Sequence, residues 1–198
     1  MTKSVWKLKA QPASFPKLIV FDLDYTLWPT WIDCTNGPPY VYEEGSNCIV
    51  NPCGESLGLF PHSAAIIALI KSFPDTKIGI ASRTHTPNWA MKALGLLRIP
   101  ELGHTTLFEN IDYFEIYPGS KLKHFKSLAE KSGIDCHEMI FFDDEHRNRE
   151  VTKLGVHFYK VNTQTGITPF QFENALQDYA TNSGVRQSSV KDFFKPKG

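Results

Sequence analysis

Two aspartates, Asp22 and Asp24, follow a continuously apolar run of the sequence, 18–21 (LIVF), and are separated by a single leucine. A carboxylate can attack phosphorus to form a covalent aspartyl phosphate, and a second carboxylate can protonate the leaving oxygen and later activate water. Because alternate residues of an extended strand share a face, both carboxylates can reach one substrate while Leu23 packs away from it. The pair therefore suits phosphoryl transfer.

Three further polar positions lie at or shortly after the ends of apolar runs: Ser82, Lys121 and the pair Asp143-Asp144. Phosphate repels an attacking carboxylate, so a divalent cation and fixed donors are needed to offset the repulsion. Hard carboxylate oxygens suit octahedral Mg²⁺, and Asp22 with one member of the 143–144 pair can supply them. The Ser82 hydroxyl and the Lys121 ammonium can bind the remaining phosphoryl oxygens. From the residues alone, the roles of Asp143 and Asp144 are interchangeable.

Short apolar runs, several rich in β-branched residues, predict the strands that carry these residues, at 18–21, 77–81, 114–117, 139–142 and 156–161. Helical spacing and capping residues predict helices between or after them, at 63–73, 88–97, 121–131, 145–154 and 169–179. This alternation implies βαβ units and an α/β fold with a mostly parallel sheet. Since ligands of such folds bind beyond the carboxyl ends of the strands, the polar residues are expected at one shared edge.

One segment, 28–60, interrupts the alternation, being rich in Gly, Pro, Asn and aromatic residues. It is too long for an ordinary loop and too small for a domain, so we interpret it as a flap inserted after the first strand. A small hairpin is expected within it, pairing 40–42 with 49–50. The domain is expected to span 16–181, and the polar residues 182–198 to form a flexible C-terminal tail.

Four strings of the sequence, in this order, resemble the motifs of the haloacid dehalogenase superfamily of phosphotransferases: FDLDYTLWP (21–29), ASRT (81–84), IYPGSK (116–121) and FFDDEHRN (141–148). Within that superfamily they are most similar to the magnesium-dependent phosphatase family, of the acid phosphatase type. The resemblance covers about 16–179 and implies a Rossmann-like three-layer sandwich, with the flap as a minimal cap.

The resemblance also implies a role for each matching residue. Asp22 would be the nucleophile and a Mg²⁺ ligand, and Asp24 the general acid/base whose backbone carbonyl also binds the metal. Thr26 would steady the first loop. Ser82 and Arg83 would bind the phosphoryl group, and Lys121 would hold nucleophile and phosphate together. Asp144 would be the third metal-binding residue, with Asp143 orienting the site from behind.

A minimal cap leaves the site open, which favours a phosphomonoesterase acting on bulky substrates such as phosphotyrosine-like groups, including phosphoproteins, or sugar phosphates. A phosphotransferase or mutase with the same intermediate must exclude water, and the small flap argues against it. The aromatic residues of the flap (Trp28, Trp31, Tyr40, Tyr42) either pack it onto the domain or line the cleft. His85 is the histidine expected nearest the site.

The C-terminal segment holds a second signal. Gln187, Val190, Phe193 and Phe194 fit the pattern of the peptide that docks on the replication sliding clamp, and basic residues flank them. The alternative is that the two phenylalanines fold back on this domain. Clamp binding would make a tethered polynucleotide phosphatase, or a non-catalytic adaptor, the alternative functions.

The composition of the chain limits the classes of binding partner that we expect. The chain has 21 Lys+Arg against 21 Asp+Glu, so no overall charge favours nucleic acid or acidic membranes, and no basic stripe is obvious in the core. No apolar run approaches the roughly 20 residues of a membrane span. Residues 1–15 lack the apolar region of a secretory signal, and the four cysteines form no CxxC pair. We expect reduced thiols and a cytoplasmic location, with the nucleus as an additional compartment.

Overall fold

The computed structural model describes residues 6–73 and 75–193, with side chains as far as 182. Its centre is a five-stranded sheet in the order β10-β9-β1-β5-β8, and every neighbouring pair in it is parallel. The strands are β1 (Leu18–Phe21), β5 (Lys77–Ser82), β8 (Tyr113–Ile116), β9 (Met139–Asp143) and β10 (His157–Lys160). All five predicted strands are therefore confirmed, with boundaries shifted by one residue or so.

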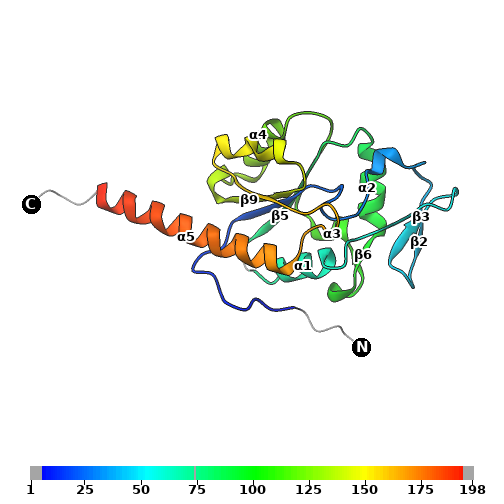
Figure 1. Ribbon diagram of the computed structural model, residues 1–198, viewed down its shortest axis with the longest axis horizontal. Coiled ribbons are helices and arrows are strands. Elements are labelled where there is room, and N and C mark those ends of the chain that lie inside the picture. Colours follow the sequence, from blue (N-terminus) through cyan, green and yellow to red (C-terminus); the bar gives the residue numbers. More distant parts are fainter. Residues whose placement is uncertain (1–5, 74, 194–198) are drawn as a thin grey trace, which may run out of the picture.

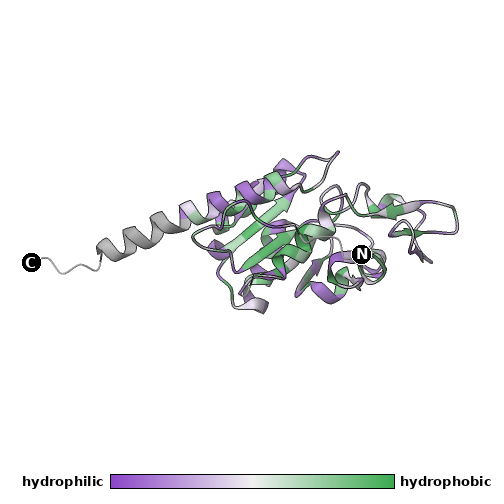
Figure 2. Cartoon of the chain, turned by 90° about the horizontal axis from the view of Figure 1, so that it is seen from below, coloured by the Kyte–Doolittle hydropathy of each residue, from purple (hydrophilic) through white to green (hydrophobic). Residues whose placement is uncertain are grey.

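Helices cover both faces of this sheet, as Figure 1 shows. The helices α1 (Ser63–Ile70) and α5 (Pro169–Phe193) lie on one face, and α4 (Lys121–Ser132) lies on the other. The central strand β1 is buried on both faces, because Ile19 and Phe21 enter one hydrophobic cluster while Leu18 and Val20 enter the other. Strands that are hydrophobic throughout, seen in Figure 2, are what a parallel sheet covered on both sides requires.

The predicted helices are present, with three differences in kind or length, the first being that α1 ends at Ile70 rather than at 73. α2 (Pro87–Leu96) and α4 match their expected ranges closely. The segment predicted at 145–154 is a 3₁₀ helix, η4 (His146–Leu154), rather than an α-helix. α5 continues to Phe193, well beyond the expected end at 179, because no proline interrupts the polar sequence that follows.

The flap is a small antiparallel sheet of β2 (Val41–Glu43), β3 (Cys48–Val50) and β4 (Ser56–Gly58). The expected hairpin is confirmed, since Val41 pairs with Val50 and Glu43 with Cys48. The third strand was not predicted. Before this sheet, the short 3₁₀ helix η1 (Ile32–Cys34) brings the chain back over the end of β1.

Several short elements were not predicted from the sequence. They are β6 (Arg98–Ile99), η2 (Pro100–Leu102), β7 (Thr105–Thr106), α3 (Leu107–Asn110) and η3 (Cys136–Glu138). The N-terminal segment also packs on the domain, with the Trp6 ring edge-on to Phe172 of α5. Elements of two to four residues carry too little periodicity to be recognised.

The segment from Asn182 onward, expected to be a flexible tail, is helical as far as Phe193. The side chains of Gln187, Val190 and Phe193, and all of Phe194, lie outside the described residues, so the boundary at 181/182 stays a prediction. Within the described part of the chain, none of the helices combines the length and apolar character needed to cross a bilayer.

Candidate active site

The residues singled out from the sequence meet beyond the carboxyl ends of β1, β5 and β9, which are adjacent in the sheet. They surround a cleft of about 350 Å³. Its lining consists of Asp22, Asp24, Trp31, Asp33, Cys34, Ser82, Arg83, Thr84, His85, Asp144, Glu145 and Arg147. The register explains the meeting point: Phe21 is level with Ile80 on one side and Phe142 on the other, so all three strands end together.

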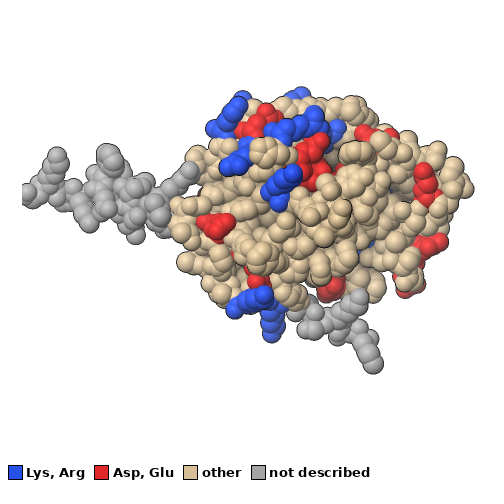
Figure 3. Space-filling view, viewed as in Figure 1, with Lys and Arg blue, Asp and Glu red and all other residues tan. Residues whose placement is uncertain are grey.

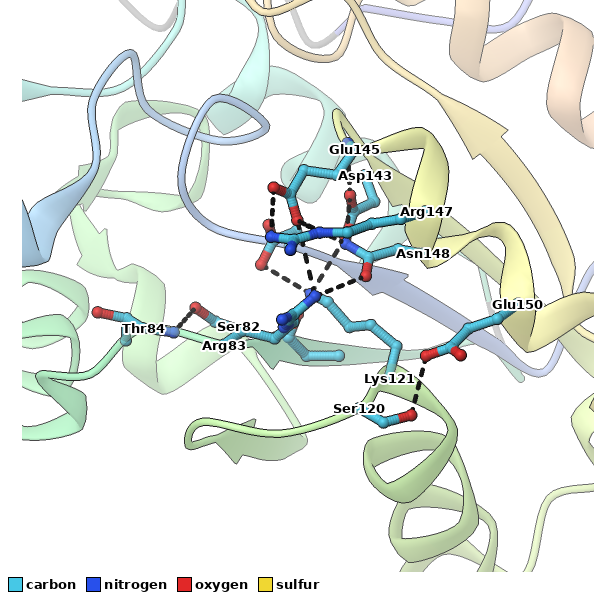
Figure 4. A network of polar contacts seen from close by, with 12 residues as sticks. Ser82, Arg83, Thr84, Ser120, Lys121, Asp143, Glu145, Arg147, Asn148 and Glu150 are labelled. Carbon is cyan, nitrogen blue, oxygen red and sulfur yellow. Dashed lines mark hydrogen bonds and ion pairs between the residues drawn. The ribbon is translucent and has the colours of Figure 1, made fainter.

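Lys121 lies completely buried beneath this cleft. Its ammonium contacts Asp22 Oδ1 at 3.0 Å and Asp143 Oδ2 at 3.1 Å, and it also donates to the carbonyl oxygen of Ala81. An ammonium has three protons to donate, so these three partners satisfy it. Figure 4 shows Lys121 reaching from the first turn of α4 to the ends of the neighbouring strands. This side chain thereby links three motifs that are far apart in the sequence.

Asp143 is fully buried, and its carboxylate is held on several sides. Asn148 donates its side-chain amide to both carboxylate oxygens at 2.9 Å, and the backbone N–H of Glu145 donates to Oδ1 at 2.7 Å. With Lys121 added, both oxygens have partners. Asp143 is therefore fixed in orientation by its surroundings, and Asn148, to which we assigned no role from the sequence, supplies much of that restraint.

Asp144 differs from its neighbour, because it is only half-buried and lines the cleft. Burial, the Asp143 carboxylate and Glu145 together raise the pKa of Asp144 to about 6. Asp22, Asp143 and Asp144 each offer a carboxylate oxygen, and these atoms lie within 4.8 Å of one another. One ammonium faces this group of three carboxylates, so the site is short of positive charge and suits a divalent cation with oxygen ligands.

Asp24 is held from the flap side. The indole Nε1 of Trp28 donates to Asp24 Oδ1 at 2.7 Å, and the backbone N–H of Ile32 donates to the same oxygen at 3.1 Å. Burial raises the pKa of Asp24 to about 6, and these two hydrogen bonds oppose the shift. Both bonds fall on Oδ1, so Oδ2 is the oxygen left for proton transfer to a ligand in the cleft.

The nucleophile candidate Asp22 is 8% exposed, and its backbone N–H donates to the carbonyl of Phe142 at 2.9 Å. Burial and the nearby carboxylates Asp143 and Asp24 raise the pKa of Asp22, while the Lys121 ammonium opposes them. Burial of this carboxylate is costly in isolation and is offset only by cations around it. The environment of Asp22 thus calls for more positive charge than Lys121 alone provides.

Ser82 and Arg83 occupy the end of β5 on the other side of the cleft. The Ser82 hydroxyl is nearly buried and accepts a 3.4 Å bond from the backbone N–H of Thr84. Arg83 is about one-third exposed and donates to Asn148 Oδ1 at 3.3 Å, which ties the 82–84 loop to the start of η4. Both residues line the same cleft as Asp22.

The flap aromatics divide between the two expected roles. Trp28 is fully buried and packs the flap while bonding to Asp24. Trp31 is 53% exposed and lines the cleft. His85 lies at the rim as expected, paired with Asp33 at 3.3 Å. The hydrogen bond between Trp28 and Asp24 was not predicted from the sequence. The spacing of four residues between them, within a turn, could have indicated it.

A larger cavity of about 650 Å³ lies elsewhere, between the flap and the η2 region, and Tyr42, Phe60 and Glu101 are among its lining residues. It contains none of the carboxylates, hydroxyl or lysine described above. The smaller cleft is the better candidate active site, because the titratable groups and their shifted pKa values converge there.

The sequence matches the family model described as acid phosphatase over residues 14–182. A hydrolase superfamily protein of the haloacid dehalogenase-like type from Schizosaccharomyces pombe is 41% identical over 80% of this chain and 92% of its own length. Magnesium-dependent phosphatase 1 of Homo sapiens is 36% identical over 91% of this chain and 97% of its own length.

Solved structures agree with the fold. The phosphatase domain in the N-terminal part of a Bacteroides fragilis protein, solved with Mg, has a TM-score of 0.56 at 20% identity, covering 83% of this chain and 40% of that one. A haloacid dehalogenase superfamily hydrolase from Ehrlichia chaffeensis has a TM-score of 0.54 at 11% identity, covering 83% of this chain and 98% of that one. At these identities the likeness concerns the fold alone.

Proposed function

Because the chain belongs to the acid phosphatase family of haloacid dehalogenase-like, magnesium-dependent phosphatases, we propose that it hydrolyses phosphomonoesters with Mg²⁺ through an aspartyl phosphate on Asp22. The observation that carries the proposal is the position of Asp22. Its Oδ1 lies 3.0 Å from the buried Lys121 ammonium, and Asp143 and Asp144 offer oxygens within 4.8 Å. The arrangement supplies a nucleophile, a fixed cation and ligands for a second cation in one place.

The metal would be held by Asp22, by Asp144 and by the backbone carbonyl of Asp24. We assign Asp144 rather than Asp143 as the direct ligand, because both oxygens of Asp143 already accept hydrogen bonds or face Lys121. Asp143 then orients Lys121 and the loop of η4. When bound, Mg²⁺ offsets the charge of the nucleophile and of the phosphate, which otherwise repel each other.

In the first step, the Asp22 carboxylate attacks phosphorus and the bond to the leaving oxygen breaks. Asp24 donates a proton from Oδ2 to that oxygen, which departs as an alcohol or phenol. Ser82 and Arg83, which line the cleft, hold the phosphoryl oxygens during the transfer, and Lys121, whose three protons already have partners, holds the Asp22 carboxylate in position from beneath. In the second step, Asp24 removes a proton from water, which attacks the aspartyl phosphate, releases inorganic phosphate and restores Asp22.

We further propose that the substrate is a phosphotyrosine-like group or a sugar phosphate. The support is the form of the cap: from the flap, only Trp31 and the two residues Asp33 and Cys34 of η1 line the cleft, and none of the described residues of β2, β3 and β4 is part of that lining. An open site can admit a phosphate on a large body. It also admits water, which favours hydrolysis over transfer to a second acceptor.

Polynucleotide ends are the alternative substrate. On the face that Figure 3 shows, Lys and Arg side chains are interspersed with Asp and Glu rather than forming one continuous stripe. Binding along a phosphate backbone needs such a stripe, so we rank this alternative lower. The sliding-clamp pattern at 187–194 lies outside the residues whose side chains are described, and no comparison supports it.

The proposal is tested by hydrolysis of an aryl phosphate with and without Mg²⁺. We expect activity that is lost with EDTA and restored by Mg²⁺, and that vanishes in Asp22→Asn. Rapid acid quenching followed by borohydride reduction should convert position 22 of the wild type to homoserine, detectable by peptide mass spectrometry. A wild type without Mg²⁺-dependent hydrolysis would contradict the proposal.

The matched control is Asp112→Asn, since Asp112 is a carboxylate that pairs with Lys77 at 3.3 Å at the opposite end of β5. This variant should keep full activity. Activity that persists in Asp22→Asn would show that another group is the nucleophile, even if Mg²⁺ is required.

A further inference from the structure

We propose that Trp31 determines specificity by stacking on an aromatic leaving group, with Tyr25 holding its indole in place. This inference rests on the proposed function, because it concerns what lies beyond the leaving oxygen in the same cleft. Trp31 would contact the part of the substrate that departs and would leave the phosphoryl group to the residues described above.

The exposure and position of Trp31 are the first observation. Its side chain is 53% exposed, although it lines a cleft whose other walls are polar or charged. Of the lining residues in the described part of the chain, Trp31 alone is a large apolar side chain. A half-exposed tryptophan leaves apolar surface in contact with water, which is unfavourable. Such exposure is expected where a bound ligand covers the ring.

The second observation is the contact that supports Trp31 from behind its exposed side. The Tyr25 ring meets the Trp31 ring edge to face, with centroids 5.2 Å apart and planes at 80°. Tyr25 has φ +54°, a left-handed conformation that costs a bulky residue of order 1–3 kcal/mol. Strain of this kind persists where the surroundings enforce it, and here it turns the Tyr25 ring toward the flap, directly after the acid/base candidate.

The third observation ties Trp31 to the chemistry. Its neighbour Ile32 donates its backbone N–H to Asp24 Oδ1, and Trp28 donates its indole N–H to the same oxygen. The turn that carries Trp31 is therefore fastened at both ends to the carboxylate that would protonate the leaving oxygen. A leaving group whose oxygen lies at Asp24 Oδ2 occupies the same cleft that Trp31 lines.

The chemistry of that face selects the class of leaving group. An indole binds flat rings by offset or edge-to-face contact more strongly than it binds a small alkyl chain. The polar pairs at the rim, Asp33 with His85 and Glu145 with Arg147, bind each other and offer little apolar surface. We therefore assign an aromatic group, such as a phenol or a benzyl alcohol, as the leaving group this wall favours.

The test compares binding of benzylphosphonate, cyclohexylmethylphosphonate and propylphosphonate to the full chain with Mg²⁺, by titration calorimetry. These probes carry the same anionic head on different bodies and are not hydrolysed. We expect benzylphosphonate to bind about tenfold more tightly than propylphosphonate, with the cyclohexyl compound between them. Trp31→Ala should remove this preference, Trp31→Phe should retain most of it, and propylphosphonate should bind all three proteins within about twofold.

The same comparison on benzyl and propyl phosphates extends the test to turnover. Because the wall touches substrate and transition state alike, Trp31→Ala should raise KM for benzyl phosphate and leave kcat nearly unchanged. Phe108→Ala is the control, since Phe108 is a 45% exposed aromatic residue that stacks on Phe114 and does not line the cleft. It should change neither binding nor turnover.

Two results would overturn the inference: a benzyl preference that survives in Trp31→Ala, or an equal loss for benzyl and propyl probes. Failure of the proposed function is distinguishable from these. It would appear as an absence of hydrolysis, whereas a Trp31-dependent phosphonate preference would still support the assignment of Trp31.

Discussion

Lys121 and Asp143 form an ion pair in which neither side chain is exposed, with Nζ 3.1 Å from Oδ2. The same ammonium lies 3.0 Å from Asp22 Oδ1. One ammonium thus lies between two buried carboxylates and contacts both of them. Breaking a buried pair by removing one partner is strongly destabilising, because the other charge is left without compensation.

For Lys121→Met we expect the free energy of unfolding to fall by about 3–5 kcal/mol in EDTA at neutral pH, since Asp22 and Asp143 would face each other without a cation. The free energy of unfolding is measured by chemical denaturation. Asp143→Asn should cost less, because Lys121 keeps Asp22 as its partner.

The double variant Lys121→Met/Asp143→Asn provides the check on this network. It should lose less stability than the sum of the two single variants, because the second change removes a charge that the first left unpaired. Simple additivity would mean that the groups act independently, contrary to the geometry.

Trp28→Phe removes the indole donor to Asp24 and keeps most of the buried ring. We expect kcat to fall by about 10- to 100-fold with KM nearly unchanged, because Asp24, the proposed acid/base, loses its orientation while the proposed phosphate contacts remain. Steady-state kinetics on an aryl phosphate measures both. An equal loss of kcat in Trp89→Phe, which changes a tryptophan of α2, would indicate general damage to packing instead.

Gly166 adopts φ +59°, and a Cβ there would overlap the Phe60 ring and lie 2.6 Å from the carbonyl oxygen of Thr26. That carbonyl, two residues after Asp24, accepts a hydrogen bond from the backbone N–H of Ile167. Gly166→Ala should therefore lower the melting temperature markedly. Gly95→Ala, in α2 with open space around the added carbon, should leave it unchanged or raise it by the equivalent of about 0.5–1 kcal/mol. Equal effects at the two glycines would contradict this interpretation.

His124 is buried one turn after Lys121, and its Nε2 lies 3.0 Å from the Tyr117 carbonyl. Burial, with the Lys121 charge adding to it, lowers the pKa of His124 to about 4 from 6.5. Below pH 6.5 the unfolded chain binds a proton that the folded chain does not, so stability falls as the pH drops toward 4.

The expected loss attributable to His124 is about 2–3 kcal/mol between pH 6.5 and 4. It is measured as the difference in unfolding free energy between the wild type and His124→Gln at each pH. Glutamine keeps an N–H donor and does not titrate in this range. Parallel stability curves for the two proteins would show that His124 does not contribute.

The order of strands and helices, and the identity of the chemical groups, could be predicted from the sequence. Runs such as 18–21 and 139–142 are apolar throughout because both faces of their strands are covered, and this leaves a pattern that is local and readable. The acids at 22, 24, 143 and 144 could be noticed for the same reason: charge directly after a buried strand is costly unless it has a purpose.

Contacts between residues that are distant in the sequence could not be predicted from local patterns. The sequence left Asp143 and Asp144 interchangeable, and their difference arises from the Asn148 amide and the Lys121 ammonium, which hold Asp143 and leave Asp144 facing the cleft. The different positions of the two flap tryptophans also depend on contacts between distant residues. Trp28 is buried on Asp24 and Trp31 is exposed in the cleft because of how η1 returns over β1. Residue types and strand ends are local properties, so they can be predicted from the chain. The partner of each carboxylate depends on contacts across up to 99 residues, and it therefore becomes known only when the chain is folded.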